Sequence, residues 1–293
     1  MSHGEPRDPR RHQHHAAPEA EAEAAAMAEL LDLDAEVLHP YLSGVTAWIR
    51  ELAADQPLRR ILDLGCGTVT GTFALLERFG DAEVTALDLS PALLHRLRDR
   101  ARQLGVADRV RAVKGDLDAP WPEAGPVDLV WASFSLHHLA DPDRALARAF
   151  AVLRPGGLLA VIEMDSFPRF LPDDVGLGRP GLEARGHAAL AAGHAQELPH
   201  FGSDWGPRLA RAGFRTEAER PFVIELTPPL PAAAGRYARA CLQRMRSGLA
   251  GQLSADDLAA LDTLVDSDGP DGLLRRDDLS VRATRTAWVA RRA

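Results

Sequence analysis

Short apolar runs alternate with amphipathic stretches through the middle of the chain, from about residue 59 to residue 163. Each apolar run has the length of a buried strand, and the stretches between the runs repeat apolar residues at helical spacing. Strands that alternate with helices predict a parallel sheet with helices on both faces, because each strand must cross over to pair with the next. The expected strands are 60–64, 83–88, 109–116, 127–133 and 158–163.

The C-terminal part of the chain adds two strands and a long helical insertion. We expect the sixth strand at 214–226 and the seventh at 281–290. The insertion at 227–280 carries two helical patterns, the second opened by a capping box that begins at Ser254. Residues 167–202 follow neither period, so we expect a loop with short helices that closes an acceptor pocket.

Ahead of the first strand, the pattern divides the chain into a polar tail and a helical cap. Residues 1–23 are rich in His, Pro, Arg and Glu without apolar periodicity, so we expect a disordered tail. Residues 24–56 repeat apolar positions at helical spacing, with a break expected at Pro40. One α/β domain is expected to fill residues 57–293.

The most informative motif lies where the first strand ends. Gly65 and Gly67 follow its last apolar residue, and a helical pattern begins at Thr70. A strand that runs into a glycine-rich turn and a helix presents backbone amides and a helix N-terminus to a pocket. The second strand ends in Asp88, whose carboxylate is placed to accept both hydroxyls of a ribose. The pattern predicts a cofactor that contains a nucleoside.

The spacing of the glycines disfavours a dinucleotide cofactor. A dinucleotide loop needs glycine or alanine at its sixth position, where that residue packs the helix against the strand. Counting from Gly65, the sixth position is Thr70, and Gly71 comes one residue late. A nicotinamide oxidoreductase is therefore only a minor alternative.

The block Leu-Asp-Leu-Gly-Cys-Gly-Thr at 62–68 resembles the first motif of the class I S-adenosylmethionine-dependent methyltransferases. Leu-His-His-Leu at 136–139 and Leu-Arg-Pro-Gly-Gly at 153–157 are similar to later blocks of that family, in the family's order. The resemblance implies a Rossmann-like α/β fold with seven strands, mostly parallel, and an antiparallel last strand at the sheet edge. It also implies that the cofactor is S-adenosylmethionine.

The resemblance assigns roles to individual residues of the cofactor site. In the family, the acid at the position of Asp63 helps to hold the cofactor's amino group, and the glycines let the methionine part approach the backbone. Asp116 falls where the family has an acid that faces the adenine amine, and Leu117 would offer its backbone amide to the ring. The residues expected to bind the cofactor are Asp63, Gly65, Cys66, Gly67, Asp88, Leu89, Asp116, Leu117 and Ser133.

One position departs from the family pattern. Val69 stands where the family usually has another glycine, and a β-branched residue disfavours positive φ. Either Gly71 absorbs the turn, or the loop narrows and cofactor affinity falls. The departure keeps a second function open, a methyltransferase-fold protein that binds the cofactor without transferring methyl groups, as a binding protein or as the catalyst of another rearrangement.

His137 and His138 are the candidates for a catalytic base. They follow the fourth strand, on the rim where family members place acceptor-side residues, and an ordinary imidazole pKa near 6.5 suits proton removal. A hydroxyl or acidic C–H acceptor needs such a base, whereas an amine can lose its proton to water. The alternative is that the two rings hold the loop and the next helix in place, because family members with many different acceptors share Leu-His-His-Leu.

The segment after the fourth strand narrows the class of acceptor. Ala-Ser-Phe-Ser at 132–135 stands where family members that methylate exocyclic amines carry Asn- or Asp-Pro-Pro-aromatic. We therefore expect in-line methyl transfer to an oxygen, nitrogen or carbon of a small organic molecule. A formal charge of −8 also disfavours a nucleic-acid partner. The helical insertion then serves either as a lid over the acceptor or as the surface of a homodimer.

Composition favours a cytoplasmic enzyme without a metal. Cys66 and Cys241 are the two cysteines of the chain, too few for a disulfide framework or a zinc-ligand cluster. Cys66 lies between the loop glycines, where a small buried residue is expected rather than a reactive thiol. No apolar run approaches the roughly 18 residues of a membrane span, so no membrane partner is expected.

Overall fold

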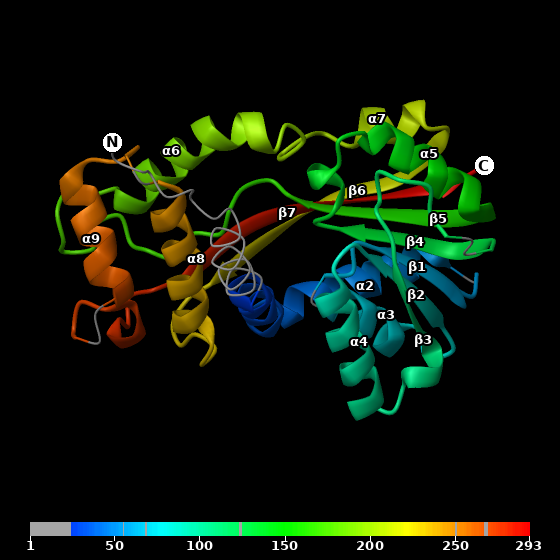
Figure 1. The fold of residues 1–293 in the computed structure, drawn as a ribbon, viewed down its shortest axis with the longest axis horizontal. Coiled ribbons are helices and arrows are strands. Elements are labelled where there is room, and N and C mark those ends of the chain that lie inside the picture. Colours follow the sequence, from blue (N-terminus) through cyan, green and yellow to red (C-terminus); the bar gives the residue numbers. More distant parts are fainter. Residues whose placement is uncertain (1–24, 55, 68, 123–124, 250, 267–268) are drawn as a thin grey trace, which may run out of the picture.

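The computed structural model contains a seven-stranded sheet with the strand order β3-β2-β1-β4-β5-β7-β6 (Figure 1). The structure describes residues 25–54, 56–67, 69–122, 125–249, 251–266 and 269–293. The expected tail at 1–23 lies outside these residues. The strands are β1 (Arg60–Leu64), β2 (Glu83–Asp88), β3 (Val110–Lys114), β4 (Val127–Ser133), β5 (Leu153–Met164), β6 (Phe214–Leu226) and β7 (Val281–Arg292).

The first five strands run parallel, and β7 runs antiparallel to both of its neighbours, as the predicted fold class requires. The expectation that the last strand lies at the sheet edge is wrong. β7 lies between β5 and β6, and β6 forms the edge. The burial pattern explains this order, because β7 is buried along most of its length whereas β6 carries exposed residues and Pro221. Charged residues and proline are typical of edge strands.

Helices cover both faces of the sheet, as Figure 1 shows. On one face, α2 (His39–Ala53), α3 (Thr70–Arg78) and α4 (Pro91–Gln103) pack over apolar residues of the central strands. On the other face lie α5 (Pro142–Val152) and α7 (Gly206–Arg211). Ser90 and Asp141 cap α4 and α5, because each side chain accepts a hydrogen bond from a first-turn N–H. Three short 3-10 turns complete the connections: η1 (Ala107–Arg109), η2 (Leu136–His138) and η3 (Leu273–Arg275).

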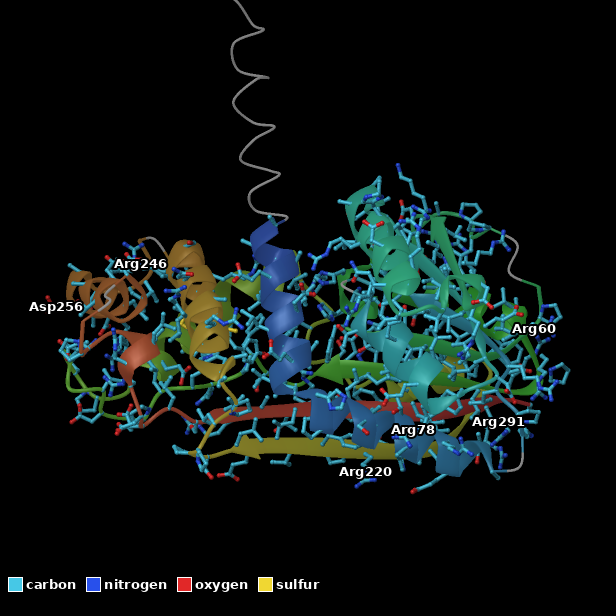
Figure 2. All side chains as sticks on the ribbon, turned by 90° about the horizontal axis from the view of Figure 1, so that it is seen from below. Arg60, Arg78, Arg220, Arg246, Asp256 and Arg291 are labelled. Atoms are coloured by element: carbon cyan, nitrogen blue, oxygen red, sulfur yellow. The ribbon has the colours of Figure 1, made fainter. Side chains whose placement is uncertain are left out.

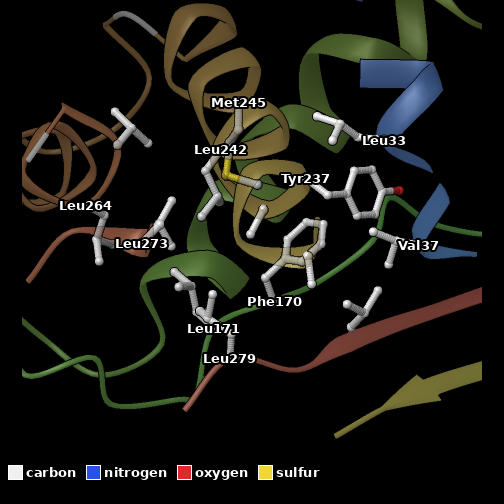
Figure 3. Close-up of a cluster of buried hydrophobic side chains, with 14 of the residues drawn as sticks. Leu33, Val37, Phe170, Leu171, Tyr237, Leu242, Met245, Leu264, Leu273 and Leu279 are labelled. Carbon is white, nitrogen blue, oxygen red and sulfur yellow. The ribbon is translucent and has the colours of Figure 1, made fainter. Parts of the chain in front are cut away.

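A second group of helices lies beside one end of the sheet and has its own apolar core (Figure 3). This helical cluster consists of residues 25–37, α6 (Leu182–Glu197), α8 (Ala234–Gly248) and α9 (Ala255–Asp266). Phe170 and Tyr237 meet edge to face in its core, with ring centroids 5.1 Å apart. In Figure 2, Arg246 marks this cluster and Arg60 marks the opposite end of the molecule.

Two features of the helical cluster bear on the sequence predictions. The chain turns at Leu38, immediately before α2, which has Pro40 in its first turn. Where we expected short helices, residues 182–197 form one helix. Its apolar residues are mostly alanine and glycine without a helical repeat of large side chains, and Gly186 fits closely against Met245. Among the described residues, none of the helices has the length and apolarity needed to cross a bilayer.

Candidate active site

A cavity of about 140 Å³ lies at the carboxyl ends of β1 and β4. One wall is the glycine loop after β1, and the other consists of residues from the helical segment 25–37, α2 and β7. Carboxyl ends of parallel strands are the usual place for ligands in such sheets. The lining residues are Leu31, Asp34, Ala35, Leu38, Tyr41, Leu42, Asp63, Gly65, Cys66, Gly67, Thr70, Gly71, Trp131, Ser133, Phe134 and Arg285.

The glycine loop is held tightly against the neighbouring strand. Gly65 N–H donates to the Leu87 carbonyl over 2.8 Å, and Gly65 has φ +69°. A Cβ at Gly65 would lie 2.7 Å from Cβ of Ser135, closer than real side chains approach. Only glycine therefore fits this position. Burial raises the pKa of the Cys66 thiol, which keeps it protonated and agrees with the structural role expected for it.

Val69 itself takes the left-handed conformation that a glycine would take, with φ +75°. Of the two alternatives for this loop, absorption of the turn by Gly71 is therefore wrong, since Gly71 lies inside α3. The Val69 side chain is buried in an apolar cluster with Leu94 and Leu97. It is not among the described residues that line the cavity.

Asp63 is a buried carboxyl group on the loop side of the cavity. It is 2% exposed, and Thr72 Oγ1 donates a hydrogen bond to it over 2.6 Å. Burial raises the pKa of Asp63 to about 7, although the bond from Thr72 opposes the shift. Near neutral pH this group therefore exists in both the protonated and the ionised form, and a nearby cation would favour ionisation.

The other predicted cofactor residues continue from the cavity along the ends of β2 and β3. Asp88 accepts hydrogen bonds from the N–H groups of Gly67 and Ser90, over 2.9 and 2.8 Å. The residues Leu89, Asp116 and Leu117 follow β2 and β3, outside the cavity lining, whereas Asp63, Gly65, Cys66, Gly67 and Ser133 lie within it.

His137, in η2 after β4, forms a buried pair with Glu163 of β5. Nδ1 of His137 lies 2.5 Å from Oε2 of Glu163, and both side chains are 3% exposed. Oε1 of Glu163 accepts the N–H of Leu136 over 3.1 Å. Sequence reasoning missed Glu163, although an acid that ends an otherwise apolar strand was a signal.

The ring of His138 lies beside that of His137, with centroids 4.1 Å apart and the ring planes tilted by 43°. Burial, with a smaller contribution from the nearby His137 and Arg244, lowers the pKa of His138 to about 4. The ring is therefore neutral at physiological pH and is a weaker base than an ordinary imidazole. Its catalytic role stays a prediction.

Aromatic rings extend from His137 toward α6. Phe201 meets His137 edge to face at 5.6 Å between centroids and stacks on Phe167 at 4.7 Å. Phe167 in turn stacks on His187 at 6.4 Å. Burial lowers the pKa of His187 to about 4, and the charge of Arg169 acts in the same direction. These rings form an aromatic cluster beside the His137–Glu163 pair.

A buried arginine was the second functional candidate that sequence reasoning missed. Arg285 comes from β7, lines the cavity and forms an ion pair with Asp34 of the segment 25–37. Its guanidinium lies over the rings of Tyr41 and Phe134, at 4.9 and 4.6 Å from their centroids. Nothing in the alternating pattern of β7 distinguished this arginine from the exposed ones, because its burial depends on the helices that pack over it.

Comparison with known proteins gives a consistent result. Residues 61–157 match the family model described as a methyltransferase domain. The chain is 38% identical over 226 residues to a 27-O-demethylrifamycin SV methyltransferase of Amycolatopsis mediterranei, covering 72% of this chain and 79% of the relative. It is 33% identical over 205 residues to a trans-aconitate 2-methyltransferase of Methylobacterium radiotolerans, covering 61% and 76%.

Solved structures show the same fold. A crystal structure from Bacillus halodurans C-125 covers 84% of this chain and 98% of its own, with 20% identity and a TM-score of 0.53. The YcgJ protein of Bacillus subtilis covers 84% and 97%, with 14% identity and a TM-score of 0.50. At these identities the likeness concerns the arrangement of strands and helices.

Proposed function

Because this chain belongs to the class I S-adenosylmethionine-dependent methyltransferases and is similar to members that act on small molecules, we propose that its acceptor is a hydroxyl group and that His137 is the base. The pair of His137 and Glu163 carries this proposal. A buried imidazole held by a carboxylate at the carboxyl edge of the sheet is the arrangement that proton removal requires.

The cofactor site of the chain fits S-adenosylmethionine. Gly65 lines the cavity without a side chain, so its backbone can be approached closely by a bound methionine part. The Asp88 carboxylate accepts two backbone N–H groups and keeps further lone pairs for the ribose hydroxyls. Asp63 would face the amino group, and Asp116 and Leu117 would face adenine. When bound, the cofactor supplies an activated methyl group.

His137 would act through the ring nitrogen that does not contact Glu163. With Nδ1–H donating to Glu163, Nε2 can accept the proton of a hydroxyl group. Glu163 then stabilises the resulting imidazolium and fixes the direction of the ring, since its other oxygen is bonded to the N–H of Leu136. General-base catalysis of this kind contributes about 10²–10⁴-fold in rate.

The surroundings of His137 favour a flat, largely apolar acceptor. Phe201 and Phe167 stack beside it, and such rings bind planar molecules through their faces. The two relatives named above act on a rifamycin derivative and on trans-aconitate, so their names do not agree on one acceptor for this chain. We propose that the helical cluster covers the acceptor.

Labelled methyl transfer tests this function. The full chain is incubated with methyl-labelled S-adenosylmethionine and a panel of small phenols, alcohols, carboxylic acids and amines. We expect label on a hydroxyl compound. His137→Ala should then lower kcat by about 10²–10⁴-fold, with S-adenosylhomocysteine affinity unchanged by calorimetry. Glu163→Gln should lower kcat less and shift its pH profile.

His95→Ala is the matched control, because His95 is a solvent-exposed histidine on α4. It should keep full activity. Label that appears on amines alone, or a His137→Ala enzyme as fast as the wild type, would contradict the proposed base and acceptor class. A protein that binds S-adenosylhomocysteine and methylates nothing would support the alternative function, cofactor binding without transfer.

A further inference from the structure

The Arg285 guanidinium is buried with far more donors than acceptors. Its side chain is 3% exposed, and a guanidinium carries five N–H donors. Among the described residues it makes one hydrogen bond, from Nη2 to Oδ1 of Asp34. Nε is buried and has no partner within the described part of the chain. Burying a cation is costly unless its remaining protons are also bonded, so this arrangement calls for another acceptor.

The nearby carboxylates do not provide the acceptors that the Arg285 guanidinium lacks. Asp34 uses the oxygen that pairs with Arg285 to accept Tyr237 OH as well, over 2.6 Å. Asp165, the other carboxylate close to Tyr41, accepts the Thr286 hydroxyl over 3.0 Å. The guanidinium carbon lies over the rings of Tyr41 and Phe134, whose π faces provide no lone pairs.

Tyr41 repeats the same feature on the same wall. Its hydroxyl is buried beside the Arg285 guanidinium and has no acceptor for its own proton among the described residues, and both Tyr41 and Arg285 line the cavity. Two unpaired donors side by side, one of them charged, match a group with two acceptor oxygens and a negative charge. A carboxylate is that group.

The opposite wall of the cavity carries the complementary charge. Asp63 lies there beside the glycine loop, so the cavity has a carboxyl group on one wall and a guanidinium on the other. We propose that Arg285 and Tyr41 bind the carboxylate of the cofactor's methionine part, while Asp63 faces its ammonium group. The inference rests on the proposed function in one respect, that S-adenosylmethionine occupies this cavity.

The proposal assigns a purpose to the Asp34–Arg285 pair. Asp34 belongs to the helical segment 25–37, Tyr41 to α2 and Arg285 to β7. A carboxylate bound to Arg285 and Tyr41 would therefore connect the N-terminal helices to the sheet on top of the cofactor. Asp34 balances the guanidinium charge in the free protein and holds it in the cavity wall.

Calorimetry with three ligands measures the role of the carboxylate directly. The ligands are S-adenosylhomocysteine, its decarboxylated analogue and 5′-methylthioadenosine, which lacks the whole amino-acid end. For the wild type we expect S-adenosylhomocysteine to bind about 10–100-fold more tightly than the decarboxylated analogue, as for hydrogen bonds to a charged group. The double variant Arg285→Gln with Asp34→Asn should reduce this preference to about threefold or less, and its affinity for the decarboxylated analogue should stay near that of the wild type.

Two further variants complete the test. Arg185→Gln with Asp257→Asn removes a similar ion pair between α6 and α9, away from the cavity, and should keep the full preference. Tyr41→Phe removes a single hydroxyl and keeps the ring under Arg285, so it tests the site even if the double variant does not fold. It should lower the preference by about 2–10-fold.

The experiment distinguishes a failure of this inference from a failure of the proposed function. A wild-type preference that survives in the double variant, or in Tyr41→Phe, places the carboxylate elsewhere and overturns the inference while the proposed function stands. That outcome would also be expected if Arg285 bound the carboxylate of an acceptor. If the wild type bound none of the three ligands, the cofactor assignment would fail together with the inference.

Discussion

Buried charged groups have different numbers of hydrogen-bond partners at the two ends of the central strands. At the amino ends of β1, β4 and β5, Asp128 accepts the N–H groups of Arg59 and Arg60, over 2.9 and 2.8 Å, and pairs with Arg154. At the carboxyl ends, Asp63 has one side-chain donor and Arg285 has one acceptor among the described residues.

Two of the three non-glycine residues with positive φ among the described residues also lie at the carboxyl ends of the strands. Val69 and Phe134, at the carboxyl ends, are non-glycine residues with positive φ, at +75° and +55°. Ala54, after α2, shares that feature away from the cavity. The comparison teaches that Asp128, which only joins strands, has its hydrogen bonds made within the protein. Asp63 and Arg285, where a ligand is expected, make fewer bonds than their groups allow.

The largest effect on stability is expected at the satisfied end. Asp128→Ala leaves two backbone N–H groups of β1 without their acceptor and should lower the free energy of unfolding by about 2–5 kcal/mol. Asp128→Asn keeps one acceptor oxygen and should lose less. Urea denaturation measures both. The affinity for S-adenosylhomocysteine should not change, since Asp128 lies at the far end of the strands.

The lowered pKa of Asp128 predicts how its contribution to stability changes with pH. Although burial opposes the shift, the N–H of Arg60, the guanidinium of Arg154 and the N–H of Arg59 lower the pKa of Asp128 below its ordinary value. The stability that its charge contributes is therefore present above the ordinary pKa and is lost as pH falls through the lower one. A difference between wild type and Asp128→Ala that stayed constant down to strongly acidic pH would contradict this account.

At the carboxyl ends of the strands, the next largest effect is expected for Asp88, on the affinity for the ligand. Asp88→Ala removes the acceptor of the Gly67 N–H and the acceptor that we propose for the ribose hydroxyls, so affinity for S-adenosylhomocysteine should fall by about 1–3 kcal/mol. Asp81→Ala, an exposed acid before β2, is the control and should bind as the wild type does. Calorimetry measures the affinity of the wild type and of both variants. Equal affinity in Asp88→Ala and the wild type would remove the ribose assignment.

Asp63 should release a proton when the ligand binds. Burial holds the pKa of Asp63 at about 7 in the free protein, and an ammonium group beside it would lower that pKa. At pH 6.5 the carboxyl group is mostly protonated, so binding of S-adenosylhomocysteine should release up to one proton. At pH 8 the group is already ionised, and the release should be small. Each pKa unit corresponds to about 1.4 kcal/mol of coupling.

Calorimetry in two buffers of different ionisation enthalpy counts those protons. Asp63→Asn serves as the control and should release none at pH 6.5. Proton release of the same size at both pH values, or in the Asn variant, would show that another group is responsible.

The smallest effect is expected at Val69. Its left-handed conformation costs about 1–3 kcal/mol, and burial of its side chain contributes about 1.5–3 kcal/mol. Val69→Gly relieves the strain and loses the burial, so the free energy of unfolding should change by about 1 kcal/mol or less. Affinity for S-adenosylhomocysteine should stay within about threefold. Binding that improved more than tenfold would mean that valine narrows the loop.

Local patterns in the sequence predicted most of the sheet and the glycine-rich turn after β1. Gly65, Gly67 and Asp88 are recognisable because their roles depend on residues nearby in the chain, a strand end and the turn after it. The position of β7 was not recognisable, since both β6 and β7 are long strands and their order depends on which one the helices cover.

The sequence also could not predict pairs between residues that lie far apart in the chain. Glu163 of β5 meets His137 of the η2 turn, and Arg285 meets Asp34 from the far end of the chain. A single charged residue in a strand gives no indication of burial until its partner is known. Asp34 and Arg285 are therefore visible as a site only in the folded structure.

A crystal structure of the complex with S-adenosylhomocysteine tests the central claim most directly, that the carboxyl ends of β1, β2 and β4 hold the cofactor. We expect both ribose hydroxyls within hydrogen-bond distance of Asp88, and the amino-acid end inside the cavity between Asp63 and Arg285. A nucleoside bound at any other place on the molecule would contradict the account.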